Sequence, residues 1–198
     1  MIADSRFREE SCPTAAALVR HLKDEWTPPG SVKSEKILDA EILSEVRRWI
    51  RGRIPEISGP EVKGWVAGHE EERSEKKSWT QSKQHQVVCL WGAGKTSDLF
   101  IYHPEGSFGL PRRGISLEIK YVSLNEKTGK AASYAGAIAT TAGQLLAYSI
   151  RHEWTIGFVW IDGPRRQSAQ GSEAHVERSE ELVKRLPPNA TLIVRFRE

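Results

Sequence analysis

Two stretches near the start of the chain carry apolar residues three and four positions apart, which is the spacing of an amphipathic helix. The first covers residues 14–26 and ends before Pro28. The second covers 34–53, and Gly52 and Pro55 are expected to end it. Its apolar stripe consists of Leu38, Ile42, Val46, Trp49 and Ile50. We therefore predict two helices ahead of the first strand.

Five later segments are rich in apolar, β-branched or aromatic residues and are predicted to be strands. They are 84–91, 97–102, 114–120, 154–161 and 190–196. The fourth of these is apolar almost throughout, as expected of a central strand that is covered on both faces. Helices are predicted over 133–152 and 172–185. Two interior glycines of the first, Gly136 and Gly143, predict close packing of that helix on the sheet.

The predicted elements follow the order helix, helix, three strands, helix, strand, helix, strand. Three successive strands, then a crossover helix and a further strand, predict an α/β fold with a mixed central β-sheet and flanking helices. At 198 residues the chain is expected to form a single domain over 1–198, with 1–33 as an N-terminal helical extension. The stretch 55–83 has no clear periodicity and predicts no element.

The strands 97–102 and 114–120 flank a connection rich in proline and glycine, which indicates a hairpin. Facing residues of an antiparallel pair have a constant sum of residue numbers, so Asp98 and Glu118 are expected to lie nearly opposite each other. Lys120 is two residues from Glu118 and therefore shares its face of the strand. The three side chains are predicted to converge on one spot, where such a group can hold a hard cation and a water molecule beside a phosphate.

The helix predicted over 133–152 adds polar side chains to this group. Gln144 and Tyr148 are four residues apart and share one face of the helix. The opposite, buried face is predicted to consist of Ile138, Ala142, Leu145 and Leu146. Each polar residue alone has an ordinary explanation, such as a solvated strand face or a turn before a strand. The functional interpretation depends on their combination.

The chain resembles the PD-(D/E)xK nuclease superfamily in the succession Ser97-Asp98, then Glu118-Ile119-Lys120, then Gln144 to Tyr148 on a small-residue helix. The resemblance covers about the middle two-thirds of the chain and implies a restriction-endonuclease-like core of helix, three strands, helix and strand (αβββαβ). Two departures are visible. Ser97 stands where many members have proline, and the acidic residue of the first helix is either Glu45, which we prefer, or Glu41.

The resemblance implies a metal-dependent nuclease that hydrolyses DNA phosphodiester bonds. In this interpretation Asp98, Glu118 and Glu45 supply oxygen ligands to Mg²⁺ or Mn²⁺. The metal lowers the pKa of a bound water, and Lys120 assists that water. Gln144 positions the water or a backbone phosphate.

Contacts to nucleic acid are predicted for Tyr148 and for two loops that flank the site. The loop residues are Arg112, Arg113, Lys127 and Lys130. Solvated loop charges explain these four equally well. Cutting both strands of DNA would favour a homodimer, since one such site cuts one strand. The sequence does not distinguish DNA from RNA.

Two other functions compete with this interpretation. The segment 92–96 ends in Gly-Lys-Thr, as a phosphate-binding loop does, but such a loop must open a helix, and here a strand is predicted over 97–102. The second is a non-catalytic module that binds nucleic acid or protein on the same fold, with Glu118 and Lys120 forming a surface pair.

Composition sets the remaining expectations. A net charge of +3 permits a polyanionic partner without requiring one. Apolar runs stay well short of the roughly 20 residues that cross a membrane, and residues 1–6 lack the pattern of a signal peptide. Of the two cysteines, Cys89 lies in an apolar run, where a buried free thiol is expected. We therefore expect a cytoplasmic protein.

Overall fold

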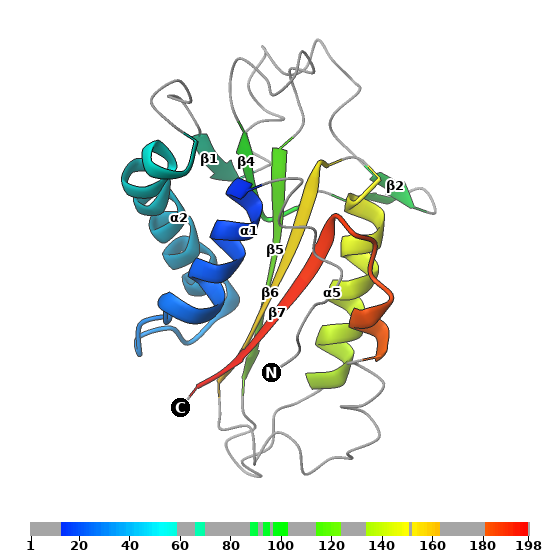
Figure 1. The fold of residues 1–198 in the computed structure, drawn as a ribbon. Helices are drawn as coiled ribbons and strands as arrows, with labels where there is room; N and C mark the ends of the chain where they lie inside the picture. The colour runs from blue at the N-terminus through cyan, green and yellow to red at the C-terminus, as the bar shows by residue number, and fades with distance from the viewer. Residues whose placement is uncertain are drawn as a thin grey trace.

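The computed structural model describes residues 13–58, 66–69, 88–90, 93–95, 97–102, 114–123, 134–150, 152–162 and 181–197. Its centre is a five-stranded mixed sheet (Figure 1) in the order β1-β4-β5-β6-β7. The strands are β1 (Val66–His69), β4 (Leu99–Tyr102), β5 (Gly114–Ser123), β6 (Trp154–Asp162) and β7 (Ala190–Phe196). β1, β4 and β5 pair antiparallel, whereas β5, β6 and β7 run parallel. The predicted α/β class with a mixed sheet is confirmed.

Helices cover both faces of this sheet. One face carries α1 (Pro13–Arg20), a short π-helix η2 (His21–Glu25) and α2 (Glu35–Ser58), and the other carries α5 (Tyr134–Tyr148), as Figure 1 shows. A short helical segment at 181–184 precedes β7. Among the helices in the described part of the chain, none is long and apolar enough to cross a membrane.

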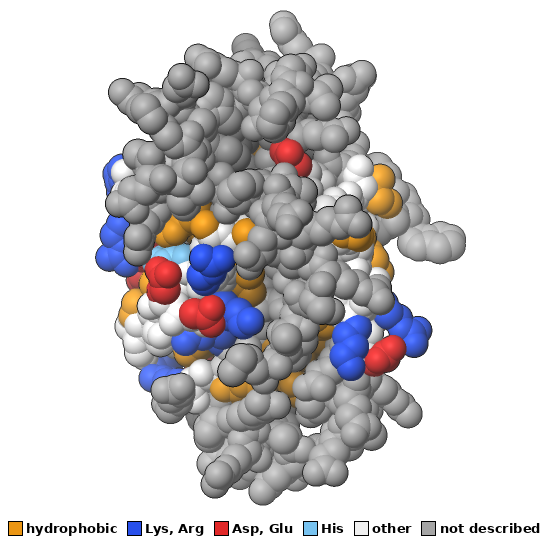
Figure 2. Space-filling view, viewed as in Figure 1, with side chains coloured by type: hydrophobic (Ala, Val, Ile, Leu, Met, Phe, Trp, Pro, Cys, Tyr) orange, Lys and Arg blue, Asp and Glu red, His pale blue; other side chains and the backbone are white. Residues whose placement is uncertain are grey.

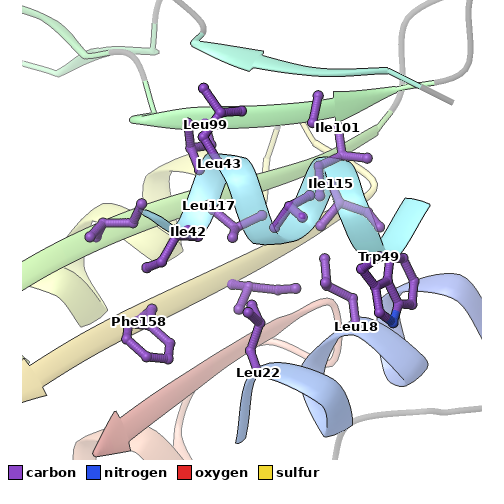
Figure 3. Close-up of a cluster of buried hydrophobic side chains, with 14 of the residues drawn as sticks. Leu18, Leu22, Ile42, Leu43, Trp49, Leu99, Ile101, Ile115, Leu117 and Phe158 are labelled. Atoms are coloured by element: carbon purple, nitrogen blue, oxygen red, sulfur yellow. The ribbon is translucent and has the colours of Figure 1, made fainter. Parts of the chain in front are cut away.

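The two faces of β5 contribute to separate clusters of buried side chains. Ile115, Leu117 and Ile119 pack against α1 and α2 in the larger cluster (Figure 3), to which the helices contribute residues such as Leu18 and Ile42. Val122 belongs instead to the cluster under α5. Side chains alternate between the two faces of a strand. Glu118 and Lys120 therefore project towards the α5 face.

The predicted hairpin register is confirmed. Leu99 pairs with Leu117 and Tyr102 with Gly114, and both pairs have the same sum of residue numbers as Asp98 and Glu118. Extending the register by one residue places Asp98 opposite Glu118. The predicted central strand is also confirmed, because β6 is buried from Trp154 to Ile161 and touches the cluster on each face.

The second predicted helix is longer than expected. It runs to Ser58, past both Gly52 and Pro55, which were expected to end it. A glycine in a helix costs about 1 kcal/mol relative to alanine, and a proline removes one backbone hydrogen bond. Buried residues on α2, including Trp49 and Ile50, pack against the larger cluster. Tertiary packing of an apolar face is the main source of helix stability in proteins, so it offsets these local penalties.

The prediction that 84–91 supplies the first strand of the main sheet is wrong. The described part of this segment, Val88–Leu90, forms strand β2 and pairs with β3 (Ala93–Lys95) in a separate two-stranded sheet. Two residues separate these strands, and such short connections favour a local hairpin. The place beside β4 is taken by β1, from the stretch 55–83 in which the sequence predicted no element.

The helix predicted over 172–185 is described only from residue 181 onward, where 181–184 is helical.

Close packing between α5 and the sheet depends on a glycine in the sheet rather than on those in the helix. Gly143 is exposed, and a Cβ atom added there would meet nothing from the neighbouring described elements within 4 Å; Gly136 is exposed as well. In contrast, a Cβ at Gly157 of β6 would lie 2.8 Å from Thr141 Cγ2 and 3.0 Å from Leu145 Cδ1. Leu146, predicted to be buried, is 44% exposed, whereas Ile138, Ala142 and Leu145 are buried as predicted.

We predict opposite stability changes for two glycine-to-alanine variants. Gly157→Ala should lower the free energy of unfolding by about 1–3 kcal/mol, because the new methyl group overlaps side chains of α5 and the side chain of Leu192 on β7. Gly143→Ala should raise it by about 0.5–1 kcal/mol, because alanine is the better helix former at an exposed position. Urea unfolding followed by circular dichroism measures both values. Equal effects of the two variants would contradict this account of the packing.

Candidate active site

The site lies where β5 extends beyond its antiparallel neighbour. β4 pairs with β5 only as far as Leu99 and Leu117, while β5 continues to Ser123. Two carboxylates accept hydrogen bonds from backbone N–H groups on the edge of β5 beyond β4. The N–H of Ile119 donates to Asp98 Oδ2 at 2.7 Å, and the N–H of Tyr121 donates to Glu35 Oε2 at 3.4 Å. These carboxylates occupy the side of β5 on which β4 would otherwise continue.

Glu118 is the buried centre of the site, with a residue exposure of 2%. Gln144 Nε2 donates a hydrogen bond to Glu118 Oε1 at 2.5 Å, and Lys120 Nζ lies 3.2 Å from the same oxygen. Lys120 Nζ also lies 3.2 Å from Glu35 Oε1, so its ammonium group bridges two carboxylates. The structure thus brings Asp98, Glu118, Lys120 and Gln144 together, as the sequence predicted.

Burial controls the charges of this group. It raises the pKa of Glu118 to about 7, and the negative charge of Asp98 acts in the same direction, while Lys120 and the Tyr148 hydroxyl oppose the shift. Burial lowers the pKa of Lys120, but the carboxylates of Glu118, Asp98 and Glu35 outweigh this and raise it above its ordinary value. Lys120 is therefore a permanent cation at neutral pH, whereas Glu118 exchanges a proton there.

The donor atoms fit a hard, partly hydrated cation. Glu118 Oε2 and Gln144 Oε1 are buried oxygens that have no hydrogen-bond partner among the described residues. The Ile119 carbonyl points to the same strand edge as its N–H, which places another oxygen on the side of Asp98. Within the described residues, three or more His, Cys, Asp or Glu side chains do not gather into a metal-binding group. Mg²⁺ commonly binds through one or two carboxylates and keeps several waters, so the number of carboxylates here is within the range for that ion.

Glu45 does not join this group. It is buried between η2 and α2, where its carboxylate bonds His21 Nε2 at 2.7 Å and pairs with Arg48. Glu35 and Glu45 are separated by about 15 Å along the axis of α2, at 1.5 Å per residue. The first-helix acid at the site is therefore Glu35, in the first turn of α2, rather than Glu45 or Glu41. The helix dipole favours an acidic residue in the first turn of any helix. The position of Glu35 in the sequence therefore gave no separate indication that its carboxylate reaches the site.

Tyr148 lies beside the carboxylate rather than on a surface. It is 1% exposed, and burial raises its pKa, with a further contribution from the charge of Glu118. A buried phenol leaves no ring face for a base, so Tyr148 serves as a neutral neighbour of Glu118 and not as a nucleic-acid contact. The other predicted contacts, Arg112, Arg113, Lys127 and Lys130, lie outside the described residues.

The competing phosphate-loop interpretation has no counterpart in the described residues. Gly94 and Lys95 belong to strand β3, and the next described element is strand β4, whereas a phosphate-binding loop opens a helix. Comparison with protein-family models, with curated protein sequences and with solved structures finds no match for this chain. What the site can do therefore follows from its own residues.

We predict that Glu118 makes stability depend on pH in the absence of metal. Its pKa rises from 4.5 to about 7 on folding, so the folded state binds the extra proton and the free energy of unfolding falls as pH rises from 4.5 to about 7. Glu118→Gln replaces the titrating carboxyl with a neutral amide. The variant should therefore be more stable than the wild type at pH 8 but similar to it at pH 5. Urea unfolding at both pH values measures the difference. A constant difference between the two proteins would show that Glu118 titrates normally.

Proposed function

We propose that this protein is a Mg²⁺- or Mn²⁺-dependent nuclease that hydrolyses DNA phosphodiester bonds. The observation that carries the proposal is the convergence of Asp98, buried Glu118 and Lys120 at the edge of β5 that extends beyond β4. The two carboxylates supply hard oxygen ligands, and Lys120, two residues after Glu118, supplies one positive charge at the same point. That combination suits phosphodiester hydrolysis without a covalent intermediate.

Each residue has a distinct part in the proposed reaction. Asp98 and Glu118 would hold the metal ion, which supplies a water of lowered pKa and polarises a phosphate oxygen. Lys120 orients the attacking water or offsets the negative charge that grows on the phosphate. Gln144 fixes one oxygen of Glu118 and so directs the other towards the metal. Glu35 holds the ammonium group of Lys120 in place.

The arrangement of the main sheet supports the resemblance to the PD-(D/E)xK superfamily. In chain order α2, β1, β4, β5, α5 and β6 follow the succession helix, three strands, helix and strand. β1 fills the place that the sequence pattern assigns to residues 84–91. We therefore also propose a restriction-endonuclease-like core, with β4 and β5 carrying the acidic residues.

The alternative of a non-catalytic binding module treats Glu118 and Lys120 as a surface pair. The 2% exposure of Glu118 argues against it, because a buried carboxylate beside a second carboxylate raises the free energy of the apo protein. Carboxyl groups with strongly shifted pKa values cluster at functional sites.

Cleavage of DNA in Mg²⁺ or Mn²⁺ tests the proposed function. Plasmid and linear duplexes should be hydrolysed by the wild type, and Lys120→Ala should lower the rate by about 100-fold or more, because it removes a charge that acts in the transition state. Lys184→Ala removes an equal charge from an exposed position in the 181–184 segment and serves as the control. Cleavage that survives in Lys120→Ala at the control rate would sink the assignment.

Glu35→Gln should separate positioning from metal binding. The variant loses the charge that holds Lys120 Nζ, so we expect the cleavage rate to fall about tenfold while Mn²⁺ affinity, measured by calorimetry, stays unchanged. Asp98→Asn should lower Mn²⁺ affinity as well. If Glu35→Gln lost Mn²⁺ binding to the same extent as Asp98→Asn, Glu35 would be a metal ligand and not a positioning residue.

A further inference from the structure

The site itself is a poor place to attract a polyanion. Asp98, Glu118 and Glu35 surround a single cation, Lys120, within the described residues of the site. Nucleic-acid affinity comes mainly from Lys and Arg side chains that neutralise phosphates. If the proposed function holds, those side chains must lie on another part of the surface.

One stripe of α2 has the required character. Lys36, Ala40, Ser44, Arg47 and Arg51 are all exposed and fall within about 80° of one another around the helix axis, at 100° per residue. We call these five residues the α2 stripe. It has basic side chains at both ends, small side chains in the middle and no acidic member. Figure 2 shows Lys and Arg side chains along the side of the molecule where Figure 1 places α2.

The stripe and the site lie along the same helix and towards the same edge of the sheet. Lys36 follows Glu35, whose carboxylate reaches the edge of β5 that β4 leaves open. At the other end, Arg47 Nε donates a hydrogen bond to the carbonyl of Ala67 at 3.0 Å, which holds its guanidinium over β1, on the far side of β4 from β5. This bond uses one of the five guanidinium donors and leaves the outer nitrogens for other acceptors.

The length and profile of the stripe suit a nucleic-acid backbone. Lys36 and Arg51 are about 22 Å apart along the axis, which corresponds to roughly 6 base pairs of duplex at 3.4 Å each. Ala40 and Ser44 between them allow a sugar–phosphate chain to approach the helix closely. The acidic neighbours, Asp39 and Glu41, are only partly exposed and flank the stripe on its two sides. Arg48 lies outside the α2 stripe, on the flank of Glu41, and pairs with Glu45.

We propose that the α2 stripe is the surface on which the DNA backbone runs as it leaves the Asp98–Glu118 site. The proposal rests on the nuclease function. In this proposal Lys36, Arg47 and Arg51 provide the affinity for duplex DNA, and the residues at the edge of β5 carry out the hydrolysis. Binding along the stripe needs no metal and no particular base sequence, because all its contacts are to phosphate.

Salt-dependent binding without divalent cations tests the stripe. The probe is a fluorescently labelled duplex of about 20 base pairs, which is long enough to cover the stripe, and anisotropy is measured in EDTA from about 50 to 200 mM KCl. Arg47→Gln/Arg51→Gln should make the slope of log K against log[KCl] shallower by about 1.8 and weaken binding at about 100 mM salt roughly 10- to 100-fold. The control, Lys184→Gln/Arg185→Gln, removes two exposed charges near β7 and should keep the wild-type slope.

A second variant avoids disturbing the Arg47 contact with β1. Ala40→Glu places a negative charge in the middle of the stripe and should weaken binding at least about fivefold, whereas Ala139→Glu, at an exposed position of α5, should not. Stripe variants that bind like their controls would overturn the inference even if the protein cleaves DNA. Stripe-dependent binding without hydrolysis in Mg²⁺ or Mn²⁺ would instead overturn the nuclease function and leave the binding surface standing.

Discussion

The early end of the β4–β5 ladder is the constraint on which the site depends. Backbone N–H groups near the interior must find acceptors, and β5 continues for several residues beyond the start of β4. Carboxylates from outside the strand take these donors, Asp98 at Ile119 and Glu35 at Tyr121. The need to satisfy a strand edge therefore collects the acidic side chains beside Glu118 and Lys120. Both carboxylates help to raise the pKa of Lys120. Burial raises the pKa of Glu118, and the charge of Asp98 adds to that shift.

The parts of this arrangement that follow from local rules were predictable from the sequence. The register of the hairpin follows from where the turn lies, and this alone places Asp98 against Glu118. Helical periodicity predicts that Gln144 lies on the polar face of α5, and its hydrogen bond to Glu118 confirms this placement. Strand alternation likewise puts Glu118 and Lys120 on one face.

The predictions that were wrong depend on the relative positions of helices and strands, which the periodicity of a sequence does not encode. Choosing Glu35 over Glu45 requires knowing how far α2 is displaced along β5, which is set by packing between the helix and the sheet. β1 is short, and the sequence Val-Ala-Gly-His contains two weak strand formers, so its pairing with β4 comes from the sheet and not from its own propensity. Residues 84–91 have the better strand pattern, but their described part pairs locally instead.

Gly157 links the packing of the fold to the chemistry of the site. It is the partner of Glu118 in the parallel β5–β6 register, and its missing side chain is what allows Thr141 and Leu145 of α5 to approach. Gln144 lies on the same turn of that helix, so the depth at which α5 sits decides how tightly Glu118 is held. Gly157 therefore connects two properties, the packing of α5 on the sheet and the burial of Glu118, which is the main cause of the raised pKa of that carboxyl. A larger side chain at this position is expected to change the stability of the domain and the acidity of Glu118 together.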